Sequence, residues 1–90
     1  MNHNNNTLFT IYTEKKDNLP ELVGRYFTGA TILYGVGLWE GKQEECALIQ
    51  IIGSPADLQS IIFLAGDIRH LNSQNVVKVT STNLAHNLDI

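Results

Sequence analysis

The stretch from Gly29 to Gly53 reads GATILYGVGLWEGKQEECALIQIIG and is the part of the chain densest in apolar and β-favouring residues. It predicts two long strands joined by a tight connection, because β-branched, aromatic and aliphatic side chains suit a pleated surface. The connection is polar and runs from Glu40 to Glu44. Gly41 within it supplies the positive φ that a tight hairpin often needs.

Both faces of this predicted hairpin are largely apolar, which is typical of strands covered on both sides. Alternation places Ile32 and Tyr34 on one face of the first strand, and Leu33 and Trp39 on the other. Two glycines, Gly35 and Gly37, also share a face. They either mark a bulge or a close approach of a helix or ring, or form a notch for a ligand or a neighbouring subunit.

On the N-terminal side of the hairpin the sequence predicts a strand, Thr7–Thr13, and a short helix, Asn18–Phe27. Asn18 is a favourable N-cap, and Glu21 falls at the reciprocal capping position. Gly29 is expected to end this helix. Residues 1–6 are polar and too short to pack, so we expect a disordered N-terminal tail.

On the C-terminal side, Ser54-Pro55-Ala56-Asp57 predicts a second helix start. This helix is expected to end near Leu71 or Asn72, and a last strand to cover Asn75–Thr82. Residues 83–90 are weakly patterned and expected to form a tail. The stripe expected to lie on the sheet consists of Leu58, Ile61, Ile62, Ala65, Ile68 and Leu71.

The element order is strand, helix, strand, strand, helix, strand, which indicates an α+β, ferredoxin-like βαββαβ fold. Residues 7–82 form one expected domain, a four-stranded antiparallel sheet with two helices on one face. The second and fourth strands along the chain should be the outer ones. The helices leave one apolar sheet face bare, so we expect a second subunit to cover it.

Composition excludes several classes of function. The net charge of −3 and the pI near 5.4 argue against general nucleic-acid binding, which needs a basic face. Cys46 is the single cysteine, and its place in a strand favours a buried, inert thiol. No signal pattern and no long apolar run is present, so we expect a soluble, cytoplasmic protein without membrane association. The histidines lack metal-ligand spacing, and the sequence indicates no metal site and no cofactor.

The element order resembles that of the small oligomeric PII and CutA type proteins. The resemblance is carried by Thr7–Tyr12, Thr31–Ile52, Ser54–Leu71 and Asn75–Thr80. It implies a trimer that binds small effectors at clefts between subunits. The short Glu40–Glu45 segment leaves no room for the long PII loop, and the nucleotide-binding motif has no match. ATP binding is therefore not implied.

Three functions follow as hypotheses. The first is a homo-oligomeric binding or regulatory module, a dimer or trimer, with a small-molecule effector in a subunit cleft. The second is an adaptor whose sheet face or edge docks onto another protein. The third is a cofactor-free enzyme that uses Glu40, Glu44 or His70 as acid or base, together with Tyr12, Tyr26 or Tyr34. The expected ligand-binding residues are Tyr34, Gly35, Gly37, Trp39 and Glu40.

Overall fold

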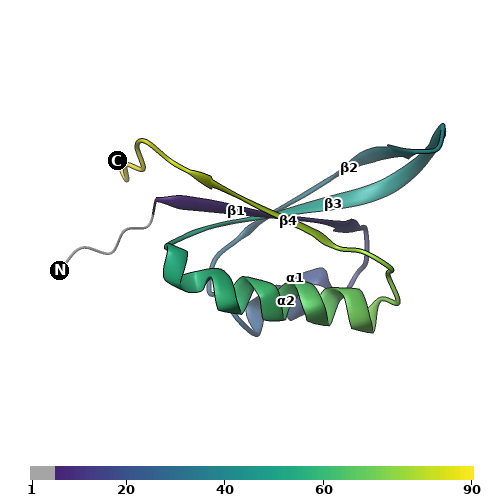
Figure 1. Ribbon diagram of the computed structural model, residues 1–90, viewed down its shortest axis with the longest axis horizontal. Helices are drawn as coiled ribbons and strands as arrows, with labels where there is room; N and C mark the ends of the chain where they lie inside the picture. Colours follow the sequence, from purple (N-terminus) through teal and green to yellow (C-terminus); the bar gives the residue numbers. More distant parts are fainter. Residues whose placement is uncertain (1–5) are drawn as a thin grey trace.

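The computed structural model describes residues 6–90, which form four strands and two helices (Figure 1). The expectations for residues 1–5 lie outside the described residues. The backbone N–H of Leu84 donates to the carbonyl of Asn6 at 2.6 Å, so the chain just after β4 lies beside the residue before β1. The elements are β1 (Thr7–Glu14), α1 (Leu19–Gly24), β2 (Thr31–Trp39), β3 (Lys42–Gly53), a 3₁₀ turn η1 (Pro55–Asp57), α2 (Leu58–Leu71) and β4 (Lys78–Asn83).

The sheet has the strand order β2-β3-β1-β4, and every neighbouring pair is antiparallel. Figure 1 shows both helices on the same face of this sheet. The ferredoxin-like α+β fold expected from the sequence is therefore confirmed, as is the outer position of β2 and β4. The opposite sheet face, called the bare face below, has no helix over it among residues 6–90.

The core lies between the helices and the two central strands. Each fully buried aliphatic or aromatic side chain contributes about 1.5–3 kcal/mol relative to leaving it in water. Val77, just before β4, and Val79 within it pack at the margin of this core. The fully buried large side chains are Phe9, Ile11, Leu19, Leu22, Ile49, Ile51, Ile61, Leu64 and Ile68.

The start of α2 follows the sequence prediction, although its first turn is 3₁₀. The backbone N–H of Ser54 donates to the Asp57 carboxylate at 2.8 Å, which is the capping interaction expected of this motif. Gly53 precedes it and is buried. A β-carbon at Gly53 would overlap the Asp57 carboxylate, so glycine is required for this cap to form.

The predicted sheet-facing stripe of α2 is partly wrong. Ile61, Ala65 and Ile68 are buried as expected, and so is Leu64 beside them. The three positions that are instead about half exposed are Leu58, Ile62 and Leu71. A helix contacts a sheet along one line of i, i+3, i+4 and i+7 positions, and these three residues lie beside that line or at its ends.

Helix α1 is shorter than predicted and lacks the predicted cap. It ends at Gly24, and the next residues close tighter turns, with the Tyr26 N–H donating to Val23 at 3.0 Å. The Asn18 amide NH₂ donates to Asn72 Oδ1 at 2.8 Å, and the Asn18 side chain accepts no backbone N–H of the helix start. Glu21 pairs with Arg25 at 3.3 Å. A contact with the distant end of α2 has replaced the local capping box.

The hairpin turn is also shorter than predicted. Only Glu40 and Gly41 form it, with φ of 49° and 77°, and the ladder resumes at once with the pair Trp39 and Lys42. Two successive positive φ values are typical of the type I′ turn that matches strand twist. Residues 42–44, expected in the connection, therefore belong to β3. The last strand, β4, begins at Lys78 rather than at Asn75.

The hairpin extends well beyond the helical layer. The β1 ladder ends where Glu14 pairs with Cys46, whereas β2 and β3 continue to the turn. We call residues 36–45 the hairpin arm; Figure 1 shows it projecting past the helices. Its side chains Val36, Leu38 and Trp39 are all more than 60% exposed. The arm thus carries apolar groups that the described chain does not cover.

Candidate functional site

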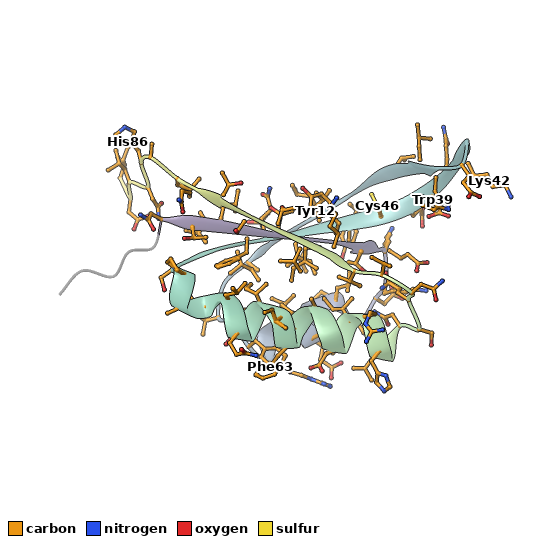
Figure 2. The ribbon with its side chains drawn as sticks, in the orientation of Figure 1. Tyr12, Trp39, Lys42, Cys46, Phe63 and His86 are labelled. Carbon is orange, nitrogen blue, oxygen red and sulfur yellow. The ribbon has the colours of Figure 1, made fainter. Side chains whose placement is uncertain are left out.

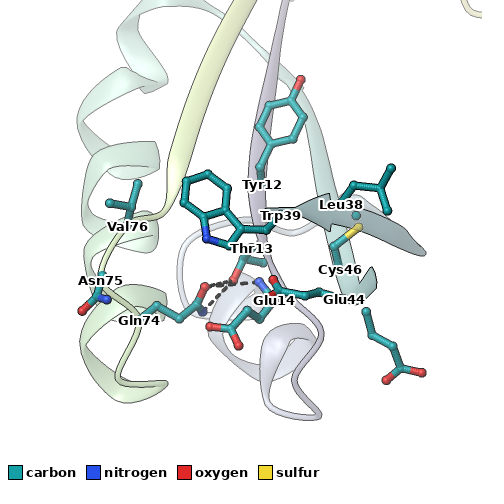
Figure 3. Close-up of a pocket in the computed structure, with 12 residues that line it drawn as sticks. Tyr12, Thr13, Glu14, Leu38, Trp39, Glu44, Cys46, Gln74, Asn75 and Val76 are labelled. Carbon is teal, nitrogen blue, oxygen red and sulfur yellow. Dashed lines mark hydrogen bonds between the residues drawn. The ribbon is translucent and has the colours of Figure 1, made fainter. Parts of the chain in front are cut away.

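A groove of about 540 Å³ lies where β1 stops and the arm continues (Figure 3). One wall is the arm, the opposite wall is the segment that leads into β4, and the end of β1 forms the floor. Its lining residues are Tyr12, Thr13, Glu14, Gly37, Leu38, Trp39, Glu44, Glu45, Cys46, Gln74, Asn75 and Val76.

The floor of the groove is held by one buried amide. Gln74 is 8% exposed, and its Oε1 accepts the Thr13 hydroxyl at 3.0 Å and the Glu14 N–H at 3.2 Å. Its Nε2 lies 2.7 Å from the Thr13 hydroxyl oxygen. These contacts, drawn in Figure 3, tie the segment before β4 to the end of β1 and fix the width of the groove.

Two aromatic side chains face the groove from different strands. Trp39 comes from the end of β2 and is 66% exposed, and Tyr12 comes from β1 and is 41% exposed. Cys46 lies in β3 beside them and is a partly exposed free thiol, so the buried position expected for it is only partly met. Figure 2 shows Trp39 on the arm, Cys46 at its base, and Tyr12 over the centre of the sheet. The aromatic surfaces can contact a flat ligand from two sides.

The charged side chains that line the groove are all acidic. Glu14, Glu44 and Glu45 line the groove, and no lysine, arginine or histidine does so among residues 6–90. Two exposed lysines lie nearby on the flanking strands: Lys42 is the cross-strand partner of Trp39, and Lys78 that of Tyr12. The walls themselves therefore present negative charge beside aromatic rings, an environment that attracts cations.

Of the five residues expected at the site, Gly37 and Trp39 line the groove. Gly35 lies one step further along β2, opposite Cys46. Tyr34 points to the helical side of the sheet, where the Lys15 ammonium lies 5.1 Å from its ring centroid. Glu40 is in the turn at the tip of the arm. The structure thus places two of the five together and the other three apart from them.

Neither glycine of the pair has a structural cause within residues 6–90. The β2–β3 register runs without a break, so no bulge is present. A β-carbon at Gly35 would meet only the Cys46 sulfur at 3.9 Å, and at Gly37 its nearest contacts would be 3.8 Å away. These are ordinary van der Waals distances. The bulge and close-packing explanations are therefore wrong, and the notch remains as the prediction.

The rest of the described chain offers less chemistry. No group of three His, Cys, Asp or Glu side chains in it could hold a metal ion. The Tyr26 hydroxyl donates to the Asp67 carboxylate between α1 and α2, and this hydrogen bond, with desolvation, raises the pKa of Tyr26. No helix in residues 6–90 has the length and apolar character needed to cross a membrane.

Sequence reasoning missed most of the groove. Gln74 and Thr13 are 61 positions apart, and no local pattern joins them. The sequence suggested Tyr12 and Glu44 only as candidate residues of an enzyme, not as parts of a ligand-binding groove. A usable signal was the length difference between the first strand and the hairpin strands, because a short central strand beside a longer hairpin leaves one end of the sheet open.

No family model matches the chain, and no curated protein matches it. Among solved structures it is similar to a DUF3240 family protein from Shewanella baltica OS155, with a TM-score of 0.71 and 12% identity. The alignment covers 96% of this chain and 97% of that one. It also matches a de novo designed protein, Foldit4, with a TM-score of 0.49, 14% identity, and coverage of 86% and 93% of the two chains. At this level of identity, the DUF3240 structure shows that the two proteins share a fold.

Proposed function

We propose that the protein is a small homo-oligomeric binding module that holds a small organic cation in the groove beside Trp39. The observation that carries this proposal is the lining of the groove: two aromatic rings and three carboxylates, with no basic side chain among the described residues that form its walls. A quaternary or protonated amine with a flat apolar body suits both features, because the ring faces and the carboxylates attract positive charge.

The dimensions of the groove support a small ligand. Pockets for small molecules typically measure about 300–1,000 Å³, and the groove, at about 540 Å³, lies within that range. Gln74 supplies a rigid floor, and backbone and amide groups near Asn75 supply polar contacts. The groove is an open cleft rather than an enclosed cavity, so a neighbouring subunit would bury the ligand more completely.

Assembly is supported by two further features. The bare face exposes Leu33 and Ile52 by about half, and the arm exposes apolar side chains on both of its faces. Contiguous apolar surface of this kind usually marks an interaction site. The element order that resembles PII and CutA type proteins also supports a homo-oligomer with ligands at its clefts. The chain differs from them in its two-residue turn.

Trp39 is the only tryptophan, so intrinsic fluorescence reports directly on the groove. The test is a titration with benzylammonium and, separately, with benzoate, which has the same ring and the opposite charge. Benzylammonium should change the Trp39 emission saturably, and its apparent affinity should fall as salt is added, because exposed charges are screened. Benzoate should not saturate. Equal responses to both compounds would contradict the proposal.

A pair of matched variants locates the ligand. Glu44→Gln removes one carboxylate from the groove wall, and Glu40→Gln removes one from the turn, outside the lining. Glu44→Gln should weaken benzylammonium binding about tenfold, the effect of losing one partly desolvated ionic contact. Glu40→Gln should leave it within about twofold. The reverse order would place the ligand at the tip of the arm.

A further inference from the structure

Strand β2 is an unprotected sheet edge. It pairs with β3 alone among the described residues, and its nine residues, TILYGVGLW, include no charge and no proline. The other outer strand, β4, begins with Lys78 and is polar apart from Val79. The β3 side of the arm carries Lys42, Glu44 and Glu45. Natural proteins blunt exposed edges with such charges, and β2 lacks them.

The backbone N–H and C=O groups of β2 that do not bond to β3 can be assigned to particular residues. The pair that closes a two-residue hairpin exchanges hydrogen bonds, and bonded pairs alternate along an antiparallel ladder. Trp39 closes this hairpin with Lys42, so Trp39 and every second residue before it in β2 form hydrogen bonds with β3. The residues between them direct their N–H and C=O groups away from β3, to the open edge. They are Ile32, Tyr34, Val36 and Leu38.

We propose that β2 pairs with β2 of a second copy of this chain, antiparallel and about a twofold axis at Gly35. Gly35 is the midpoint of Thr31–Trp39, so this register pairs the whole strand. The two sheets become one sheet of eight strands, and four pairs of edge residues exchange eight backbone hydrogen bonds. This inference rests on the assembly part of the proposed function and gives that assembly its surface.

The register explains the two glycines. Gly35 meets the partner's Gly35 at a non-hydrogen-bonded pair, where Cα atoms approach to about 4.5 Å. Gly37 lies opposite the partner's Leu33, and the missing side chain leaves room for that leucine. On the other face Val36 lies opposite the partner's Tyr34, an aromatic and β-branched pair of the kind that stabilises sheets. Both glycines thus acquire a function that the single chain does not give them.

A hollow beside β2 supports the proposed register independently of the glycines, because it can hold a side chain of the partner. It measures about 210 Å³ and lies on the helical side of the sheet, where Val23, Phe27 and Ile32 form its apolar lining. In the proposed register the partner's Leu38 lies directly opposite Ile32 on that same side. Leu38 is 74% exposed in the single chain. The partner's leucine therefore enters an apolar hollow of suitable size, twice in each dimer.

The area available is close to what a stable dimer needs. Five exposed side chains of β2 take part: Leu33, Tyr34, Val36, Leu38 and Trp39. They leave on the order of 600 Å² of surface uncovered per copy, if a full aromatic side chain offers about 150–250 Å². Specific interfaces bury about 800 Å² per partner. The β2 backbone edge and the hollow supply the remainder.

The pairing also changes the groove. Trp39 lies opposite the partner's Thr31, and Gly37 opposite the partner's Leu33, both on the side of the sheet that faces the ligand. The partner's β2 adds at the outer edge of β2, so it extends the arm wall of the groove beside Trp39 and Gly37. Each dimer would hold two such grooves, one at each end of the shared ladder.

Disulfide trapping tests the register. Gly35→Cys is made together with Cys46→Ser, because Cys46 is the neighbour of Gly35 within the chain. A non-hydrogen-bonded pair has the Cα spacing that a disulfide requires, so mild oxidation should give a covalent dimer of twice the 10.0 kDa chain. Leu33→Cys with Cys46→Ser is the control and should stay uncrosslinked. Adding Gly37→Cys to that control should restore the crosslink. Trapping of Leu33→Cys alone would overturn the register.

A second pair of variants tests the edge itself. Val36→Pro removes an outward N–H, which an edge strand tolerates, and Val36→Thr keeps it. By sedimentation, the wild type and Val36→Thr should be dimers, and Val36→Pro should be a monomer with an unchanged circular dichroism spectrum. A monomeric wild type would contradict both the assembly and this inference. A wild-type trimer, or a dimer that Val36→Pro leaves intact, would contradict this inference alone.

Discussion

At the scale of the residue, Gln74 is the side chain on which the groove depends most. It is buried and lies just after α2, where it satisfies a hydroxyl and a backbone N–H at the end of β1. A buried donor that loses its partner costs more than the bond itself contributed, because the group stays desolvated. Gln74 therefore fixes both local stability and the separation of the two groove walls.

Replacing Gln74 with Ala should lower the free energy of unfolding by about 1–3 kcal/mol, because the buried Thr13 hydroxyl and the partly buried Glu14 N–H would lose their partner. Urea unfolding at one protein concentration measures the change. Gln59→Ala is the control: Gln59 is exposed on α2, and its loss should stay within about 0.5 kcal/mol. Equal effects of the two changes would mean that the amide contacts do not hold the segment.

Tyr26 gives the chain a predictable response to alkali. Its hydrogen bond to Asp67 raises its pKa in the folded state. The folded chain then keeps the phenolic proton at pH values where the unfolded chain has lost it, so stability falls with rising pH. The contribution is complete below about pH 10 and is lost as the pH rises through the raised pKa. In Tyr26→Phe, thermal unfolding between about pH 9 and 12 should depend less steeply on pH. Parallel curves for the two proteins would contradict this assignment.

At the scale of the element, the sequence predicted those features that short-range chemistry determines. The Ser54-Pro55 start of α2 and its end at Leu71 were predicted because caps and helical spacing act within a few residues. The features it did not predict depend on distant partners. Asn18 bonds Asn72 rather than capping α1, and residues 42–44 join the ladder because Glu40 adopts a positive φ that is uncommon for glutamate.

Replacing two glycines with alanine should change the free energy of unfolding in opposite directions. Gly41 has a φ of +77° in the hairpin turn, so Gly41→Ala should lower the free energy of unfolding by about 1 kcal/mol. Gly66 lies within α2 with no atom near its missing side chain, so Gly66→Ala should raise it by about 1 kcal/mol. Urea unfolding of both variants at one protein concentration checks the signs. Stabilisation by Gly41→Ala would show that the turn is not of this type.

At the scale of the whole molecule, alternation predicted correctly that the hairpin is apolar on both faces. It could not locate the groove, because the groove depends on contacts between distant parts of the chain. β1 ends before β3 does, and Gln74, which follows α2, bonds to the end of β1. It also could not assign causes to Gly35 and Gly37. Those causes depend on which atoms approach each glycine, and within the described chain none comes close.

The apolar surface of the arm leads to a prediction about the stability of the whole molecule. A 90-residue chain has a modest core, so part of its stability should come from the interface. When folding is coupled to dimer formation, the midpoint of thermal unfolding depends on protein concentration. For a chain of this size it should rise by roughly 3–6 °C for each tenfold increase. In Val36→Pro the midpoint should be lower and independent of concentration. A wild-type midpoint that stays constant over a hundredfold range would mean that the core alone sustains the fold, and that the exposed strand β2 faces water.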